Sequence, residues 1–171
     1  SPNPGSSEEN YRDNPTPDTK GKVVVSDTDH LWGHTGGDAV WVWKSFTRGL
    51  NVLLMEEFTP SPAWQDSARE AMGQARRYAE KMDLAAMTPA AELCSTGYCL
   101  AAKGREYLAF MPGSPGQFNV NLTDVAGGCS AEWLNVTTGK TVPGQEVRGG
   151  ARRTFATPFG GPAVLYLKCG G

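Results

Sequence analysis

The sequence has no run of apolar residues long enough to cross a membrane, which takes about 18–20 in succession. It also lacks an excess of basic residues, because 16 Lys and Arg stand against 18 Asp and Glu, and the formal net charge is -2. The broad positive field that is typical of nucleic-acid-binding proteins is therefore missing. We expect neither a membrane nor a nucleic acid as a partner.

The motifs of several enzyme classes are missing as well. There is no G-x-S-x-G, no Walker glycine loop and no G-x-G-x-x-G ahead of a helix, so a serine hydrolase or a nucleotide-binding protein lacks support. His30 and His34 have the spacing of two metal ligands on a helix, but Gly33, Gly36 and Gly37 disfavour a helix there. We therefore predict no metal and no cofactor.

The N-terminal residues, SPNPGSSEENYRDNP, have neither the basic start nor the apolar core of a signal peptide. Residues 1–21 include four prolines and show no apolar periodicity. Such a segment has too little apolar surface to order itself, so we expect a flexible arm or loop.

Residues 22–91 show an alternation of strand and helix patterns. Two short β-rich runs, residues 22–26 and 51–55, have the composition of strands that are buried on both faces. A helix is predicted after each run, the first beginning behind an Asp38 cap and the second spanning residues 64–82. The order βαβα implies parallel strands with helical crossovers. Trp41 and Trp43 lie within the first helix, and we interpret them as packing residues.

Residues 92–171 have a different sequence pattern, in which short β-rich runs alternate with glycine and proline. The runs are residues 97–102, 106–111, 117–122, 131–135, 153–156 and 163–167. Strands of this length and spacing predict an antiparallel β-sandwich or barrel. The boundary between the two regions falls between Met82 and Gly97.

Acidic residues follow both strands of the first region, at the edge where parallel α/β proteins bind ligands. Asp27 and Asp29 would point the same way in an extended chain, about 6–7 Å apart, and Glu56 or Glu57 would approach from the neighbouring strand. Carboxylates that converge in a cleft suit acid/base or nucleophilic chemistry on a glycosidic bond. Trp32 would offer a stacking face for a sugar, and His30 a hydrogen bond. The alternative is that these acids only form turns or cap helices.

The four cysteines allow three full pairings. Cys94 and Cys99 are close enough in sequence to close a small loop, and Cys129 and Cys169 would join an internal strand to the last one. Disulfides would place the protein in an oxidising compartment, and no C-x-x-C is present to indicate a zinc ribbon or a thioredoxin-like site.

Several of these stretches resemble a known family. Five resemble the end of an apiosidase-like glycoside hydrolase barrel, namely residues 24–33 (VVSDTDHLWG), 42–51 (VWKSFTRGLN), 72–80 (MGQARRYAE), 87–89 (MTP) and 95–101 (STGYCLA). Three more resemble a β-sandwich named for collagen binding, namely residues 132–135 (EWLN), 138–139 (TG) and 155–167. The resemblance covers about residues 22–168.

The resemblance implies an α/β fold followed by an all-β one. Residues 22–91 would be the last two βα units of a (β/α)8 barrel, and residues 92–171 a C-terminal antiparallel β-sandwich. A complete barrel takes about 250 residues, so this barrel would be incomplete. By analogy with related sugar hydrolases, the end of the seventh strand would present the nucleophile or base, here Asp29 or Asp27. The general acid usually lies on the fourth strand, which is missing from this sequence.

We therefore expect the C-terminal part of a secreted or periplasmic glycoside hydrolase that acts on a polysaccharide or oligosaccharide. His30, Trp32 and Glu56 would bind substrate, and the chain alone would be inactive. The alternative is a non-catalytic module that binds carbohydrate, collagen or another matrix polymer. A third possibility is that the β-region only caps and stabilises the barrel.

Overall fold

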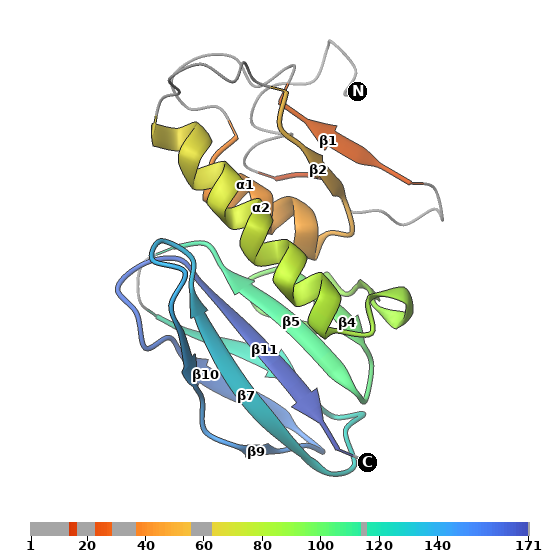
Figure 1. Cartoon of the computed structure of the whole chain (residues 1–171). Helices are drawn as coiled ribbons and strands as arrows, with labels where there is room; N and C mark the ends of the chain where they lie inside the picture. Colours follow the sequence, from red (N-terminus) through yellow and green to blue (C-terminus); the bar gives the residue numbers. More distant parts are fainter. Residues whose placement is uncertain (1–13, 17–22, 29–36, 56–62, 114–115, 171) are drawn as a thin grey trace.

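The computed structural model describes residues 14–16, 23–28, 37–55, 63–113 and 116–170 (Figure 1). The first region consists of β1 (Val25–Asp27), α1 (Ala39–Thr47), β2 (Asn51–Leu53) and α2 (Ala63–Lys81). β1 and β2 pair in parallel, with Val25 opposite Asn51. The βαβα order and the parallel pairing that the sequence predicts are both confirmed.

The beginning and the end of α1 follow from local chemistry. Asp38 caps the helix, because its Oδ1 accepts a hydrogen bond from the Trp41 N–H at 2.9 Å, as predicted. After the helix ends, Gly49 adopts a positive φ of 77°, a conformation that glycine reaches without steric cost. Leu50 follows this turn instead of continuing the helix, and β2 begins at the next residue.

The two parallel strands are shorter and more exposed than the sequence predicts. Val25 is 41% exposed and Leu53 is 46% exposed, so the expectation that both strands are buried on both faces is wrong. Among the described residues, β1 and β2 pair only with each other. In the part of the chain that the structure describes, the large hydrophobic side chains that are exposed to solvent all lie in this first region. They are Val23, Val24, Val25, Leu53, Met55 and Leu84.

The segment expected as a flexible arm is described only at residues 14–16. Pro15 is buried there, and its carbonyl accepts a hydrogen bond from the Arg48 guanidinium at 2.8 Å. This part of the predicted arm therefore packs against the end of α1.

The β-region contains one large and one small antiparallel sheet. The strands are β3 (Thr88–Pro89), β4 (Cys99–Ala102), β5 (Glu106–Met111), β6 (Gln117–Asn121), β7 (Gly128–Asn135), β8 (Thr141–Pro143), β9 (Val147–Arg148), β10 (Arg152–Ala156) and β11 (Ala163–Cys169). The large sheet has the order β3-β4-β5-β11-β7-β8, with β9 also paired to β7, and β6 and β10 form a separate two-stranded sheet. The six predicted β-rich runs are all strands, whereas β3, β8 and β9 are too short to show a pattern.

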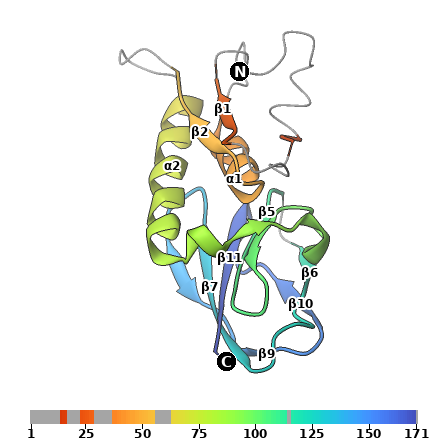
Figure 2. The same ribbon diagram turned by 90° about the vertical axis from the view of Figure 1, so that its right-hand side faces the viewer.

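The large sheet is buried on both of its faces. Along β5, Leu108 and Phe110 belong to a core shared with α1 and α2, whereas Tyr107 and Ala109 belong to a second core shared with β6 and β10. The molecule therefore has three layers, namely helices, the large sheet and the β6–β10 pair (Figure 1, Figure 2). The antiparallel β-region is confirmed, but the helices cover one face of the large sheet. A simple two-layer sandwich would leave that face to solvent.

Trp43 lies at the centre of the first core and is fully buried. Its ring packs against Tyr78 of α2 and Phe110 of β5, at centroid distances of 5.9 and 6.3 Å. Its indole N–H donates to Gln74 at 3.3 Å, and Gln74 in turn donates to the Val136 carbonyl at 3.0 Å. One side chain thus ties the helices to the β-region, and the packing role predicted for the tryptophans is confirmed.

The cysteines form one disulfide, between Cys129 of β7 and Cys169 of β11. The two residues lie opposite each other in the strand register. Cys94 and Cys99 are free thiols, so the second pairing that the sequence allowed is not formed. Burial raises the pKa of both thiols, which keeps them protonated and unreactive. None of the described helices is long and apolar enough to span a bilayer.

Replacing Trp43 by Ala should destabilise both regions together. We expect a loss of about 3–5 kcal/mol in the free energy of unfolding, because the change leaves a cavity where the two regions meet. Urea unfolding measures this loss, and hydrogen exchange should show lower protection in β5 as well as in α1. The exposed residue Leu84, changed to Ala, is the control, with an expected effect within about 0.5 kcal/mol. Loss of protection confined to α1 would contradict the shared core.

Candidate functional site

The carboxyl ends of β1 and β2 meet at one edge of the structure. The parallel register places Asp27, the last residue of β1, opposite Leu53 of β2. The Thr28 N–H then donates to the Leu53 carbonyl at 3.2 Å, and the Thr28 hydroxyl accepts from the Met55 N–H at 2.8 Å. The segment that leaves β1 is therefore fastened to the segment that leaves β2.

Polar side chains are buried at this edge. Ser26, Asp27 and Thr28 are each less than 10% exposed, with Asp27 at 8%. Gly37 lies beside them, since a Cβ at this position would come within 2.9 Å of the Thr28 methyl and 2.5 Å of the Trp41 ring. Burial of a carboxylate is costly, so an Asp at the ligand-binding edge of parallel strands is a candidate for function.

Of the five site residues that the sequence predicts, the structure places Asp27 alone. Asp29, His30, Trp32 and Glu56 lie outside the described residues. The structure does bring the ends of β1 and β2 side by side, and these are the two elements from which the predicted acids follow. Among the described residues, no group of three His, Cys, Asp or Glu side chains is arranged to hold a metal ion.

A second polar cluster, which the sequence did not reveal, lies where α2 meets the large sheet. The Tyr78 hydroxyl donates to Glu132 Oε1 at 2.7 Å, and the Lys81 ammonium bonds to the same oxygen at 2.7 Å. Tyr78 and Lys81 are on α2, whereas Glu132 is on β7. The Lys81 ammonium also lies over the Tyr166 ring, 4.9 Å from its centroid.

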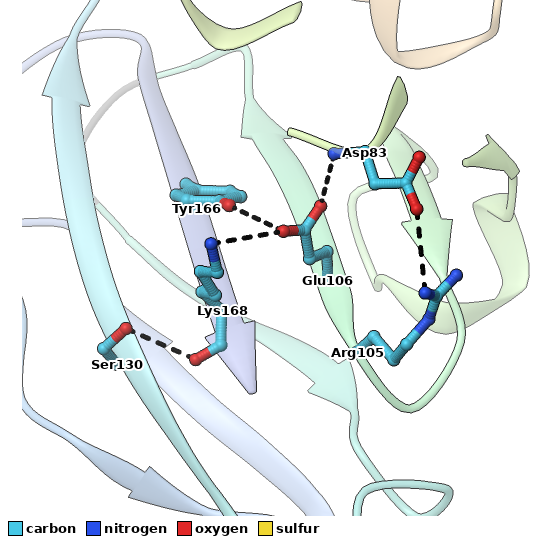
Figure 3. Close-up of polar contacts among 6 residues, drawn as sticks. All are labelled: Asp83, Arg105, Glu106, Ser130, Tyr166 and Lys168. Atoms are coloured by element: carbon cyan, nitrogen blue, oxygen red, sulfur yellow. Dashed lines mark hydrogen bonds and ion pairs between the residues drawn. The ribbon is translucent and has the colours of Figure 1, made fainter. Parts of the chain in front are cut away.

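Glu106 of β5 anchors the other half of this cluster (Figure 3). Its Oε1 accepts a hydrogen bond from the Tyr166 hydroxyl at 3.1 Å, and its Oε2 accepts from the Asp83 N–H at 2.9 Å. Lys168 lies farther away, with 3.9 Å between its Nζ and Glu106 Oε1. The side chain of Glu106 thus holds Asp83, which follows the C-terminal end of α2, against the large sheet.

The charges of this cluster indicate a structural role, in which it holds α2 on the large sheet. We call the cluster the polar clamp; its members are Tyr78, Lys81, Glu106, Glu132 and Tyr166. Burial, and then the hydrogen bond to Glu132, raise the pKa of Tyr78 far above its ordinary value. Burial and the Glu106 carboxylate do the same to the pKa of Tyr166. Burial by itself would raise the pKa of Glu132, but Lys81 and Tyr78 outweigh it and lower that pKa. The tyrosines therefore stay protonated donors and the glutamate a charged acceptor near neutral pH.

No sequence signal marks the clamp, because its partners are far apart in the chain. The Tyr78–Glu132 bond joins residues 54 positions apart, and the Tyr166–Glu106 bond joins residues 60 apart. The ring of Tyr78 is buried in the core between α2 and the sheet, whereas its hydroxyl reaches Glu132.

Two solved structures with a similar fold are described as glycoside hydrolases. One, described as a glycoside hydrolase, has a TM-score of 0.57 at 11% identity and matches 77% of this chain and 37% of its own. Another, a glycoside hydrolase family 5 protein from Bacteroides vulgatus, has a TM-score of 0.56 at 12% identity, over 79% of this chain and 37% of its own. At this identity the likeness concerns the fold. The chain spans little more than a third of these proteins, and no family model and no curated protein matches it.

Replacing Glu132 by Gln should weaken the clamp in a pH-dependent way. Because the folded-state pKa lies below the ordinary value of 4.5, folding favours the ionised carboxylate. Its contribution to stability is present above about pH 4.5 and is lost as the pH falls through the lower folded value. For this partly exposed pair we expect a loss of about 1 kcal/mol at pH 7, shrinking toward pH 3.

Urea unfolding at several pH values measures this loss. The control is Glu80→Gln, which removes an exposed carboxylate that pairs with Arg76 on the outer face of α2. It should change stability by no more than a few tenths of a kcal/mol. A Glu132→Gln deficit that stays constant from pH 7 to pH 3 would count against the ionised clamp.

Proposed function

We propose that this chain is the C-terminal portion of a glycoside hydrolase that cleaves glycosidic bonds in a polysaccharide. The observation that carries the proposal is the parallel β1–β2 pair, whose shared carboxyl edge buries Asp27 next to the segments that continue toward Asp29 and Glu56. The fold shared with solved glycoside hydrolases supports the same class of reaction. A carbohydrate is accordingly the proposed substrate.

In this proposal Asp29 and Asp27 are the acids that act at the glycosidic bond. His30, Trp32 and Glu56 shape the sugar site through hydrogen bonds and stacking. Two carboxyl groups are needed on opposite sides of the scissile bond, one to protonate the leaving oxygen and one to act as nucleophile or base. The partner acid is assigned to another strand of the barrel, as in related sugar hydrolases.

The exposed apolar surface of the first region supports further βα units in the complete protein. β1, β2 and the residues next to them expose valine, leucine and methionine side chains that a closed barrel would cover. An open cavity of about 840 Å³ lies beside them, lined by apolar groups of α1, β2 and α2 such as Phe46, Val52 and Met72. A barrel needs about 250 residues, so six more βα units would lie outside this chain.

The Cys129–Cys169 disulfide fits an extracellular or periplasmic location, where such bonds persist. That location also suits an enzyme whose substrate is a polymer outside the cell. The comparisons give no support to collagen as a partner.

The second candidate function is glycan binding by the β-region without catalysis. A polar groove on the large sheet beside Lys81 favours it. The shared core around Trp43 favours the third role, in which the β-region holds the last βα units in place. Binding and support are compatible with each other and with catalysis at the other end of α2.

Replacing Asp29 by Asn in the full-length hydrolase should lower kcat by about 100- to 10,000-fold, because the amide neither ionises nor transfers a proton. Release of reducing sugar from a panel of polysaccharides measures this change. Asp124→Asn, an exposed substitution in the β-region, is the matched control and should leave the rate unchanged. Near-normal turnover by the Asp29→Asn variant would refute the assigned role.

The 171-residue chain by itself should show no hydrolysis, because the acid on the opposite side of the scissile bond belongs to another strand. Unactivated oligosaccharides are the substrates for this assay, since their alkoxide leaving groups depend on protonation by the missing acid. Turnover above the buffer rate by the purified chain would show that its own residues form a complete site.

A further inference from the structure

A groove of about 360 Å³ lies on the large sheet beside the C-terminal end of α2. It is far from β1 and β2 in the fold and shares no lining residue with the cavity described above. Its polar lining comes from four elements, α2, β7, β8 and β11, and consists of Lys81, Ser130, Glu132, Thr141, Tyr166 and Lys168.

The two lysines of the groove differ in how far they are already engaged. Lys81 is held by Glu132 at 2.7 Å and belongs to the clamp. The side chain of Lys168 is 63% exposed, and its ammonium is 3.9 Å from Glu106, near the outer limit of an ion pair. Glu106 itself is satisfied by Tyr166 and by the Asp83 N–H (Figure 3). Lys168 is therefore the cation that an anionic ligand would meet.

Side chains that can donate and side chains that can accept hydrogen bonds line the groove in which Lys168 lies. Ser130 is its neighbour on β7, and its hydroxyl donates to the Lys168 carbonyl at 3.3 Å (Figure 3). Thr141 of β8 lies opposite Leu134, four residues along β7 from Ser130, and adds a second hydroxyl farther along the groove. The clamp bonds of Glu132 described above both go to Oε1, so its Oε2 is the oxygen that can accept from a ligand hydroxyl. Val142 and Pro143 add apolar surface.

We propose that this groove binds an acidic saccharide, with a uronate carboxylate on the Lys168 ammonium and sugar hydroxyls on Ser130, Thr141 and Glu132. A charged donor beside hydroxyls and a carboxylate matches a ligand that carries one anion among many hydroxyls. The class of ligand rests on the proposed function, whereas the anionic preference rests on Lys168. The groove would hold the polymer on the β-region while another part of it reaches the carboxyl edge of β1.

The test is a titration of the ¹⁵N-labelled 171-residue chain, followed by NMR. The ligands are trisaccharides of glucuronic, galacturonic and mannuronic acid, with cellotriose as the neutral comparison. We expect amide shifts at Ser130, Glu132, Thr141 and Lys168 with at least one uronate, and weaker binding as salt is raised. Lys168→Gln should weaken that binding about tenfold or more.

Lys103→Gln is the matched control, because it removes another exposed ammonium, from the turn between β4 and β5, at a distance from the groove. It should leave the dissociation constant unchanged. Cellotriose binding as tightly as the uronates, or a Lys168→Gln affinity equal to that of the parent chain, would overturn the acidic class. Absence of shifts in the groove with every uronate would overturn the site.

These outcomes are separate from those of the proposed hydrolase. Binding is measured on this chain without turnover, whereas hydrolysis is measured on the full-length protein. A chain that binds uronates but belongs to a protein without glycosidase activity would refute catalysis and leave the groove standing. A full-length hydrolase that depends on Asp29, with a groove that binds nothing, would refute the groove alone.

Discussion

The burial of Trp43 between helix α2 and the large sheet is the interaction on which the rest of the structure depends. Its ring packs against Tyr78 and Phe110, and its N–H is satisfied by Gln74, so a large apolar group is buried without an unpaired donor. This contact sets the position of α1 on the sheet. Because α1 connects β1 to β2, it also sets where their carboxyl ends lie, and hence where Asp27 is held.

The polar clamp continues from this core to the C-terminal end of α2. Tyr78 is common to both, because its ring packs on Trp43 and its hydroxyl donates to Glu132. Because the bonds of Glu132 and Glu106 reach the end of α2 from two different strands, the clamp fixes the angle of α2 as well as its distance from the sheet. The two proposed binding sites, the carboxyl edge of β1 and the groove at Lys168, are thereby connected through one rigid helix.

Local patterns in the sequence were sufficient for the helices and most strands. The Asp38 cap and the apolar spacing of α2 depend on neighbours in the chain, and both are found in the structure. The prediction that β1 and β2 are buried was wrong. The composition of a strand indicates whether its side chains can be buried, but it does not indicate which neighbouring elements are present to cover them. Val25 and Leu53 have the composition of buried strands, yet they lie on an exposed pair. The strands β3, β8 and β9 depend on pairing with longer neighbours and have no pattern of their own.

The sequence by itself determined the βαβα order, the antiparallel β-region and the presence of acids at the end of β1. Each of these depends on the order and spacing of residues that are close together in the chain. Only the tertiary structure decided that the helices cover one face of the large sheet and that Cys129 pairs with Cys169 while Cys94 and Cys99 stay reduced. It also decided that Glu132 bonds to α2 and Glu106 to Asp83, just after that helix. These features join residues that are tens of positions apart. Their partners are chosen by the packing of whole layers, which no local pattern records.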